Sequence, residues 1–245
     1  MNHSIYKTIC ELGLKSQELI SISLDFGLIG QAREIKCIDG YLRYLLRKNV
    51  KFDFVAQVAK GKTLLVGEGN LSFALSLARK QSINPAFITA TTFEKVNELS
   101  QDAKDNAKKL RILGAEVLHG INASKIADIF SDKRFETIIF QFPHAGSREP
   151  IDDHNPNFIL VSNFLNNAAR LLVNDGAVLI SAVDSPHYHG AFQFEDAAKE
   201  AGFAKPTIYP FEPSDFIGYE HTMTHQSGSA LENHDKFSTW VFHLE

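Results

Sequence analysis

Short apolar runs alternate with amphipathic segments along residues 62–245, and this alternation constrains the fold more than any other feature of the chain. Segments with apolar residues at helical spacing separate the first five runs. Because neighbouring parallel strands need a helical crossover, this order predicts a parallel sheet with helices on both faces. Seven runs have the length and composition of buried strands: residues 63–66, 87–92, 115–121, 135–142, 177–183, 206–211 and 238–244.

Two of the separating segments have a strong helical period. The first runs from Val96 to Leu110, and the second from Phe158 to Leu172, with Gly176 expected to end that helix. The last two strands have no helix of adequate length between them, so we expect the final strand to be antiparallel. The predicted fold is α/β: a Rossmann-like, doubly wound, mostly parallel seven-stranded sheet with an antiparallel last strand, plus a helical N-terminal extension.

The N-terminal residues differ in pattern from the rest of the chain. Leu42, Leu45 and Leu46 have helical spacing within a basic stretch that is poor in glycine. We therefore divide the chain into a helical N-terminal extension, residues 1–60, and a Rossmann-like domain, residues 61–245. Nothing in the extension indicates chemistry.

Composition excludes several classes of protein. A chain of 245 residues that is 44% hydrophobic and 22% charged is globular rather than disordered. Two cysteines, Cys10 and Cys37, make neither a disulfide framework nor a cysteine-rich zinc site, so we expect a reducing, cytoplasmic location. No run of 18 uncharged apolar residues occurs, and no contact with a membrane is expected.

Charge is distributed unevenly. The net charge of −4 argues against a protein that binds nucleic acid through bulk positive charge. Residues 31–62 nevertheless carry eight Lys and Arg against three acids, whereas residues 184–245 carry ten acids against three Lys. The basic stretch is either a solvated helix face or a surface for a polyanion.

The turn after the first predicted strand has the composition of a cofactor site. Gly67 and Gly69 allow a tight turn and a close approach of backbone to ligand. The helix that follows offers free N–H groups at its N-terminus, and Ser72 either caps this helix or contacts the ligand. In a doubly wound sheet, ligands bind at the carboxyl ends of the strands, which is where this turn lies.

Two cofactors compete for this site. A dinucleotide fingerprint requires a third glycine, where this chain has Ser72, and its strand-2 acid comes late, at Glu94. S-adenosylmethionine requires backbone room, an acid for the ribose hydroxyls (Glu94) and an amide for the adenine edge (Asn122). Glu94 could also be only a cap of the following helix. The predicted cofactor residues are Gly67, Glu68, Gly69, Asn70, Ser72, Glu94, Asn122 and Gln141.

The end of the fourth predicted strand is the candidate reaction site. If the cofactor is S-adenosylmethionine, the reaction is methyl transfer from a sulfonium, an in-line displacement in which positioning is most of the work of the protein. Gln141 can accept a hydrogen bond from a ring N–H, Pro143 stiffens the turn, and Phe142 or His144 can stack on a base. If the target is an imide nitrogen, His144 is either the base that removes its proton or a structural turn histidine. The predicted catalytic residues are Gln141, Pro143 and His144.

A group of histidines follows the later strands. His187, His189, His221 and His225 do not have the spacing of a zinc signature, so no metal site is predicted. We expect Tyr188 and His221 to line the substrate pocket together with Phe142 and His144.

Two motifs give the chain a family resemblance. Residues 65–73, Leu-Val-Gly-Glu-Gly-Asn-Leu-Ser-Phe, resemble the GEGNFSF signature of the ribosomal RNA uridine-N3 methyltransferase-like family. Residues 135–146, Phe-Glu-Thr-Ile-Ile-Phe-Gln-Phe-Pro-His-Ala-Gly, resemble its FDxIIFNFPHxG motif, and residues 90–94 and 119–123 match its second and third strand ends. The resemblance covers residues 62–245. It implies a class I methyltransferase fold, S-adenosylmethionine as cofactor, and methylation of uridine N3 in ribosomal RNA.

Three departures from the family pattern leave alternatives open. Gln141 replaces Asn, Asn122 replaces a frequent Asp, and no arginine follows His221. Because the last departure removes positive charge, the substrate is either RNA or a small molecule or protein. A further alternative is a non-catalytic module that binds S-adenosylmethionine or a nucleotide. A nicotinamide-dependent reductase is disfavoured by Ser72 and by the missing helix before the last strand.

Overall fold

The computed structural model describes residues 51–147, 149–221, 234 and 236–245. Residues 1–50 of the predicted extension, the positions after His221 where the family pattern carries arginines, and His225 lie outside the described residues. The division of the chain at residue 60 therefore stays a prediction. Within the described part, Phe54 and Val58 of the short helix α4 (Phe54–Val58) share a hydrophobic core with Phe73.

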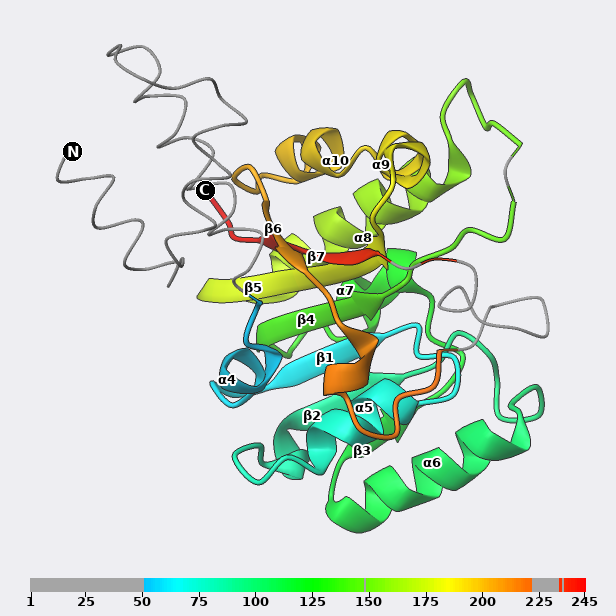
Figure 1. Ribbon diagram of the computed structural model, residues 1–245, viewed down its shortest axis with the longest axis vertical. Helices are drawn as coiled ribbons and strands as arrows, with labels where there is room; N and C mark the ends of the chain where they lie inside the picture. Colours follow the sequence, from blue (N-terminus) through cyan, green and yellow to red (C-terminus); the bar gives the residue numbers. More distant parts are fainter. Residues whose placement is uncertain (1–50, 148, 222–233, 235) are drawn as a thin grey trace, which may run out of the picture. The chain divides into compact units, whose positions relative to one another are not determined.

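Seven strands form one sheet in the order β3-β2-β1-β4-β5-β7-β6 (Figure 1). Strands β1 to β5 pair in parallel, and β7 is antiparallel to both of its neighbours, β5 and β6. The Rossmann-like, mostly parallel fold with an antiparallel last strand is thus confirmed. The strands are β1 (Thr63–Val66), β2 (Ile88–Thr91), β3 (Glu116–Leu118), β4 (Phe135–Gln141), β5 (Leu172–Val183), β6 (Thr207–Pro210) and β7 (Phe237–Phe242).

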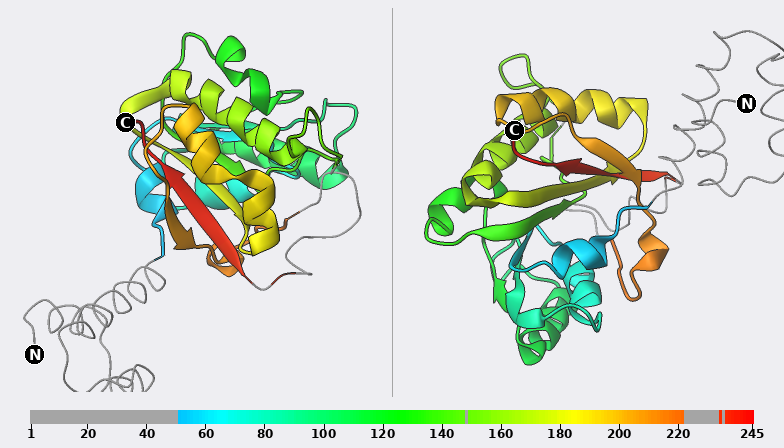
Figure 2. Two further views of the ribbon diagram at one scale, coloured as in Figure 1. Left: turned by 90° about the horizontal axis from the view of Figure 1, so that it is seen from above. Right: turned by 90° about the vertical axis from the view of Figure 1, so that its left-hand side faces the viewer.

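Helices cover both faces of the sheet (Figure 2). They connect the strands at the places that the sequence pattern indicates. Besides α4, the described helices are α5 (Ser72–Ala78), α6 (Gln101–Leu113), α7 (Ile126–Ile129), α8 (Pro156–Leu171), α9 (Pro186–Phe192) and α10 (Phe194–Glu200), with 3-10 turns η1 (Pro85–Phe87), η2 (Ala123–Lys125) and η3 (Pro213–Asp215).

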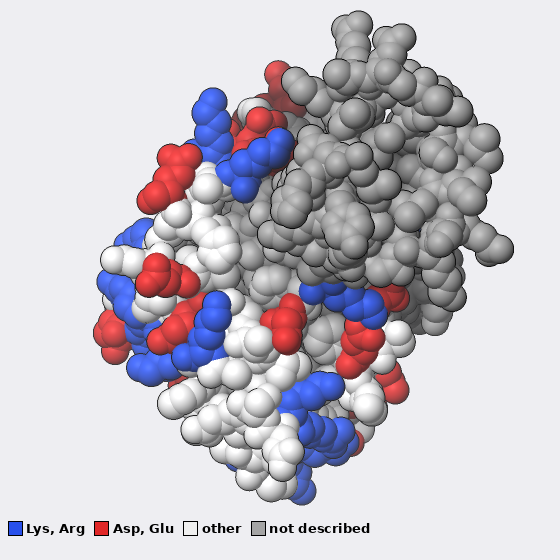
Figure 3. All heavy atoms as spheres, turned by 60° about the vertical axis from the view of Figure 1, so that its left-hand side comes forward, with Lys and Arg blue, Asp and Glu red and all other residues white. Residues whose placement is uncertain are grey.

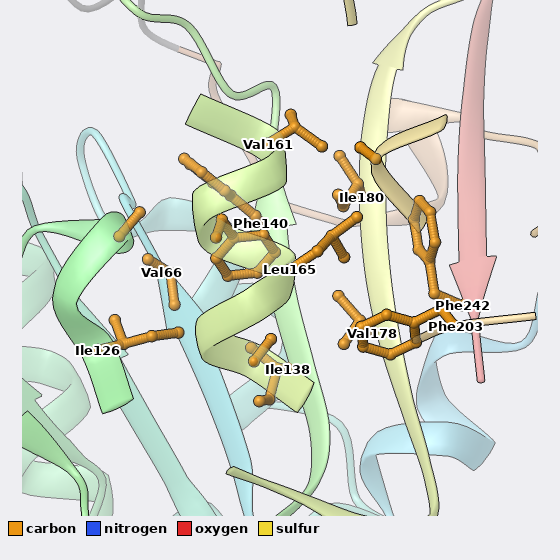
Figure 4. Close-up of a cluster of buried hydrophobic side chains, with 14 of the residues drawn as sticks. Val66, Ile126, Ile138, Phe140, Val161, Leu165, Val178, Ile180, Phe203 and Phe242 are labelled. Carbon is orange, nitrogen blue, oxygen red and sulfur yellow. The ribbon is translucent and has the colours of Figure 1, made fainter. Parts of the chain in front are cut away.

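Alternate residues of the central strands pack into two separate hydrophobic cores, one on each face of the sheet. In β1 all four residues are buried, and Leu64 and Val66 face α7 and α8, whereas Leu65 faces α5 and α6. Figure 4 shows the first core, in which Val161 and Leu165 of α8 lie against the sheet residues Phe140, Val178 and Ile180. The second core is rich in aromatic rings. The centroid of the Phe54 ring lies 5.8 Å from that of Phe73 and 5.3 Å from that of Phe216. Double coverage explains the continuous apolar runs of the sequence.

Two predicted helix boundaries are wrong. The helix through Phe158 ends at Leu171, and β5 begins at Leu172, five residues before its expected start. The helix through Ala103 begins only at Gln101, because the Ser100 side chain accepts the Ala103 N–H and caps it. Val96 is therefore outside the helix, and it is 62% exposed.

Candidate functional site

A cavity of about 620 Å³ lies where the carboxyl ends of β1, β2, β3 and β4 meet. Val66 of β1 is in register with Phe140 of β4, so Gly67 and Gln141 leave neighbouring strand ends. The N-terminal part of α8 and residues 219–221 complete the wall. A volume in this range, ~300–1,000 Å³, is typical of sites for small molecules and cofactors.

The cavity brings together ten of the thirteen residues that the sequence analysis selected. Ser72 and Pro143 are buried outside it, and Tyr188 lies in α9, where its ring stacks on Phe192 at 6.2 Å between centroids. The functional roles of all thirteen remain predictions. The ten on the wall are Gly67, Glu68, Gly69, Asn70, Glu94, Asn122, Gln141, Phe142, His144 and His221.

Gly67 is required at the end of β1. Its φ of +65° is a left-handed conformation, and a Cβ atom there would lie 2.7 Å from Cε2 of Phe140. The Glu68 N–H donates to the Thr91 carbonyl at 2.8 Å, which ties the turn to the end of β2. The glycine thus brings the β1 turn against the β4 strand.

Glu68 is a buried acid, only 5% exposed. Its Oε2 accepts the Ala74 N–H of α5 at 3.1 Å. Burial raises the pKa of this carboxyl to about 7, although the Ala74 hydrogen bond opposes the shift. Burial and the nearby Glu68 charge likewise raise the pKa of the Tyr219 hydroxyl well above its ordinary value.

Asn70 and Ser72 bind the protein itself. Asn70 Nδ2 and Ser72 Oγ donate to the Glu220 carbonyl at 2.8 and 3.0 Å, and the Glu220 N–H donates to Ser72 Oγ at 2.9 Å. The Ser72 N–H donates to Asn70 Oδ1 at 3.0 Å. The expectation that the first N–H groups of α5 are free is therefore partly wrong. The Ser72 N–H already donates to Asn70, and the Ala74 N–H already donates to Glu68. The N-cap position is held by Leu71, not by Ser72, at a φ of +64°.

The ends of β2 and β3 carry the residues expected to bind the ribose and the adenine. Glu94 is half-buried on the cavity wall. Asn122 Oδ1 accepts the Ser124 N–H at 2.9 Å and caps η2, so its NH₂ group is the part that could reach a ligand. Phe93, which the sequence analysis did not select as a site residue, lines the same wall and is 57% exposed.

Gln141 at the end of β4 differs from the polar residues of the β1 turn in its hydrogen bonding. Both of its amide atoms, Nε2 and Oε1, are buried without a hydrogen-bond partner among the described residues. The next residue, Phe142, has a φ of +49°, and its N–H donates to the Ser181 carbonyl at 2.8 Å. A buried amide with both groups unpaired is costly, and because this one lies on the cavity wall it is a candidate to bind a ligand.

Two imidazoles lie on the wall near this amide. His144 is exposed, and its Nδ1 accepts the Gly146 N–H at 2.9 Å, which places the proton of the neutral ring on Nε2. The His221 ring packs edge-on against Phe142, with 4.7 Å between centroids. Burial lowers the pKa of His221 to about 4, so this ring is neutral at physiological pH.

The charge of the cavity suits a cation. Glu94, Glu98 and Glu220 line it together with Glu68, whose raised pKa of about 7 leaves it partly neutral, and no Lys or Arg occurs among the described lining residues. S-adenosylmethionine carries positive charge on its sulfur and amino group and negative charge on its carboxylate, so its net charge is positive. Phe93 and Ile121 form an apolar part of the wall, of the kind that an adenine ring can pack against. The residues present therefore fit this cofactor. Within the described part of the chain, no group of three His, Cys, Asp or Glu is placed to hold a metal.

Other lining residues have no sequence signal of their own. Ile159, Leu160 and Asn163 reach the cavity from α8, and Tyr219 from the segment after η3. In sequence the α8 residues look like ordinary helix positions, and only the crossing of α8 over the strand ends exposes them to the cavity.

None of the helices in the described residues is long and apolar enough to cross a membrane.

Comparisons with known proteins agree with the family resemblance. The model of the BMT5-like family, described as rRNA (uridine-N3-)-methyltransferase BTM5-like, matches residues 64–223. The uncharacterized protein At4g26485 of Arabidopsis thaliana is 38% identical over 206 residues, which cover 74% of this chain and 91% of that protein. Human ferredoxin-fold anticodon-binding domain-containing protein 1 is 30% identical over 179 residues, or 67% of this chain.

The chain spans only 28% of the length of that human protein. Among solved structures, that of TrmN from Thermus thermophilus has a TM-score of 0.47 at 16% identity, covering 78% of this chain and 47% of that one.

Proposed function

Because the chain belongs to the BMT5-like family of rRNA (uridine-N3-)-methyltransferases, we propose that it transfers a methyl group from S-adenosylmethionine to N3 of a uridine in ribosomal RNA. The observation that carries this proposal is Gln141, whose amide lies on the cavity wall with both Nε2 and Oε1 unpaired among the described residues. A uracil base presents an N–H between two carbonyl groups. An amide with a spare donor and a spare acceptor complements that edge.

The cofactor, when bound, supplies a methyl group activated by a positively charged sulfur. The residues of the chain must then place N3 in line with that group, and such positioning lowers the barrier most. Gln141 Nε2 donates to a carbonyl beside N3, where negative charge develops as the ring proton leaves. Phe142, held at its strained φ of +49°, offers its ring as a surface for the base.

The departing ring proton has two candidate acceptors. His144 faces a constraint, because accepting a proton at Nδ1 requires breaking the bond from the Gly146 N–H. His221 is neutral, but with a pKa of about 4 it holds a proton weakly and serves better as a hydrogen-bond acceptor. His144 therefore remains the proposed base, acting after the residues 144–146 turn rearranges. A base within a paired region must first be flipped out of the stack.

The test is methyl transfer from labelled S-adenosylmethionine into RNA, protein and metabolite fractions from a strain that lacks this protein. We expect label in ribosomal RNA, and digestion to nucleosides should yield N3-methyluridine. The Gln141→Ala variant should lose the transfer while still binding the cofactor in calorimetry. Label confined to metabolites or to another base atom would contradict the proposal.

One observation favours a second candidate, an uncharged small-molecule acceptor. No Lys or Arg occurs among the described lining residues. Figure 3 shows a different face of the molecule, on which the described basic and acidic side chains are interspersed. Phosphate contacts release counterions, so RNA binding should weaken steeply with salt. Transfer to RNA that is insensitive to salt, or absent, would favour the small molecule.

A further inference from the structure

The segment before residue 222 is held to the turn after β1 by three hydrogen bonds. The Glu220 carbonyl accepts from Asn70 Nδ2 at 2.8 Å and from Ser72 Oγ at 3.0 Å, and the Glu220 N–H donates to Ser72 Oγ at 2.9 Å. About 150 residues of chain separate the two sides of this contact. We name these three bonds the Glu220 latch.

Each polar side-chain atom of the latch already has a hydrogen-bond partner within the protein. Asn70 is 6% exposed and Ser72 is 3% exposed. Asn70 Oδ1 already accepts the Ser72 N–H at 3.0 Å, and Asn106 Nδ2 fixes the Asn70 carbonyl at 2.9 Å. Ser72 Oγ both donates and accepts within the latch, so the hydrogen bonds of these two side chains are made within the protein.

The latch fixes the two residues beside Glu220. On one side, the Tyr219 ring packs edge-on against Phe73 of α5, with 5.2 Å between centroids. On the other side, the His221 ring packs against Phe142 at 4.7 Å, directly after the unpaired amide of Gln141. The position of Glu220 therefore fixes the position of the His221 ring, which lines the cavity, relative to the end of β4.

We propose that Asn70 and Ser72 are positioning residues for the acceptor side of the cavity: they hold Glu220 so that His221 and Phe142 form the wall against which the base is placed. This inference rests on the proposed function, and it assigns to the turn after β1 a role beyond cofactor binding. The inference predicts that the transfer rate and the cofactor affinity respond differently to loss of the latch. Loss of the latch should disturb the rate of transfer and leave cofactor affinity almost unchanged.

The experiment uses the full chain with two latch variants. Ser72→Ala removes two of the three bonds, and Asn70→Asp removes the third while keeping an acceptor for the Ser72 N–H. For both we expect the rate of methyl transfer into total RNA, at saturating S-adenosylmethionine, to fall at least tenfold. The cofactor dissociation constant, measured by calorimetry, should stay within twofold. The control is Ser162→Ala, which removes a similarly buried hydroxyl that is bonded to Glu200 at 3.2 Å and is not part of the cavity wall.

Two further readouts separate positioning from a general loss of structure. Amide hydrogen exchange at Glu220 should speed up at least tenfold in Ser72→Ala and not in Ser162→Ala. Adding Ser72→Ala to a His221→Ala variant should lower the rate less than it does in the unaltered chain, because residues that act through one another are not additive.

The opposite pattern would overturn the inference. If the latch variants bind the cofactor at least tenfold more weakly with an unchanged rate at saturation, Asn70 and Ser72 are cofactor ligands. If rate and affinity both stay at the level of the unaltered chain, the latch has no role in transfer. An unaltered chain that binds no S-adenosylmethionine would instead refute the proposed function, which is a distinguishable result.

Discussion

The turn after β1 and the turn after β4 lie side by side on one cavity, yet they use their polar side chains in opposite ways. After β1, the side chains of Glu68, Asn70 and Ser72 are all bonded to other parts of the protein. After β4, the Gln141 amide has no partner among the described residues for either of its polar atoms. Both turns come from motifs in which polar residues were expected to contact a ligand.

This difference separates residues that build a site from residues that serve it. A buried polar group that already has partners adds rigidity, whereas one without partners costs free energy until a ligand binds. By this criterion we propose that Gln141 contacts the ligand and that Glu68, Asn70 and Ser72 shape the wall. Substitutions on the two turns can test whether that criterion holds.

The largest effect is expected for Gln141→Met, a change that keeps the approximate size of the side chain and removes its polar atoms. We expect the rate of methyl transfer to fall by about 10²–10³, or ~3–4 kcal/mol, the usual cost of losing one donor to a developing charge. The free energy of unfolding should stay the same or rise by about 1 kcal/mol, because an unpaired amide is no longer buried. Kinetics and thermal unfolding measure the two effects.

Gln57→Met is the matched control. Gln57 is also buried, at 5% exposure, but its Nε2 donates to Thr137 Oγ1 at 3.1 Å and it lies outside the cavity wall. We expect this variant to lose stability and to retain its rate. A loss of stability in Gln141→Met similar to that in Gln57→Met would show that the Gln141 amide is structural.

Glu68→Gln should change the pH dependence of stability. The pKa of Glu68 is raised from 4.5 to about 7, so the folded state holds this proton more tightly than the unfolded state does. That contribution is fully present below pH 4.5 and is lost as the pH rises to about 7, an effect of about 3 kcal/mol. The introduced amide stays neutral and can still accept the Ala74 N–H, so the variant should be more stable than the unaltered chain at pH 8 and equal to it at pH 4.5.

Denaturant unfolding at both pH values measures this effect, with Glu94→Gln on the half-buried Glu94 as control. Parallel stability curves for the unaltered chain and Glu68→Gln would mean that Glu68 is ionised in the folded state. Glu68 would then be a candidate partner for a cationic cofactor rather than a part of the wall.

Much of the fold could be predicted from the sequence. Burial on both faces makes the central strands continuous apolar runs, and all seven strands overlap their predicted ranges. Element boundaries are harder to predict. The end of α8, for example, depends on the pairing of β5 with β4 rather than on Gly176. Leu172 aligns with Phe135 of β4, and the strand register shifts before Thr137 meets Ala177.

The site was predictable only in part. Glycines and polar residues after apolar runs indicate the strand ends, and ten selected residues line the cavity. Their hydrogen bonds could not be inferred, because Ser72 and Asn70 bind a residue about 150 positions away in the chain. Phe93 was missed since an exposed aromatic ring looks like any other apolar residue in sequence.

Phe93→Ala tests the apolar part of the wall that the motifs do not mark. Phe93 is 57% exposed, so removal of its ring should leave the thermal unfolding temperature almost unchanged. Loss of a ring that covers a bound adenine should weaken cofactor binding about tenfold, or ~1.4 kcal/mol. Phe87→Ala is the control, because Phe87 is 46% exposed and lies outside the cavity wall. Equal cofactor affinity in both variants would remove Phe93 from the site.

The smallest and sharpest comparison is between Asn122→Ala and Asn84→Ala. Each asparagine caps a 3-10 turn through Oδ1, accepting an N–H two residues later, at 2.9 Å in Asn122 and 3.1 Å in Asn84, but only Asn122 lines the cavity. Both variants should lose about 0.5–1 kcal/mol of stability from the missing cap. If the Asn122 NH₂ group also donates to the adenine edge, only Asn122→Ala should weaken cofactor binding, by about three- to tenfold. Equal affinities would place Asn122 with Asn70 and Ser72, as a residue that shapes the wall without contacting the ligand.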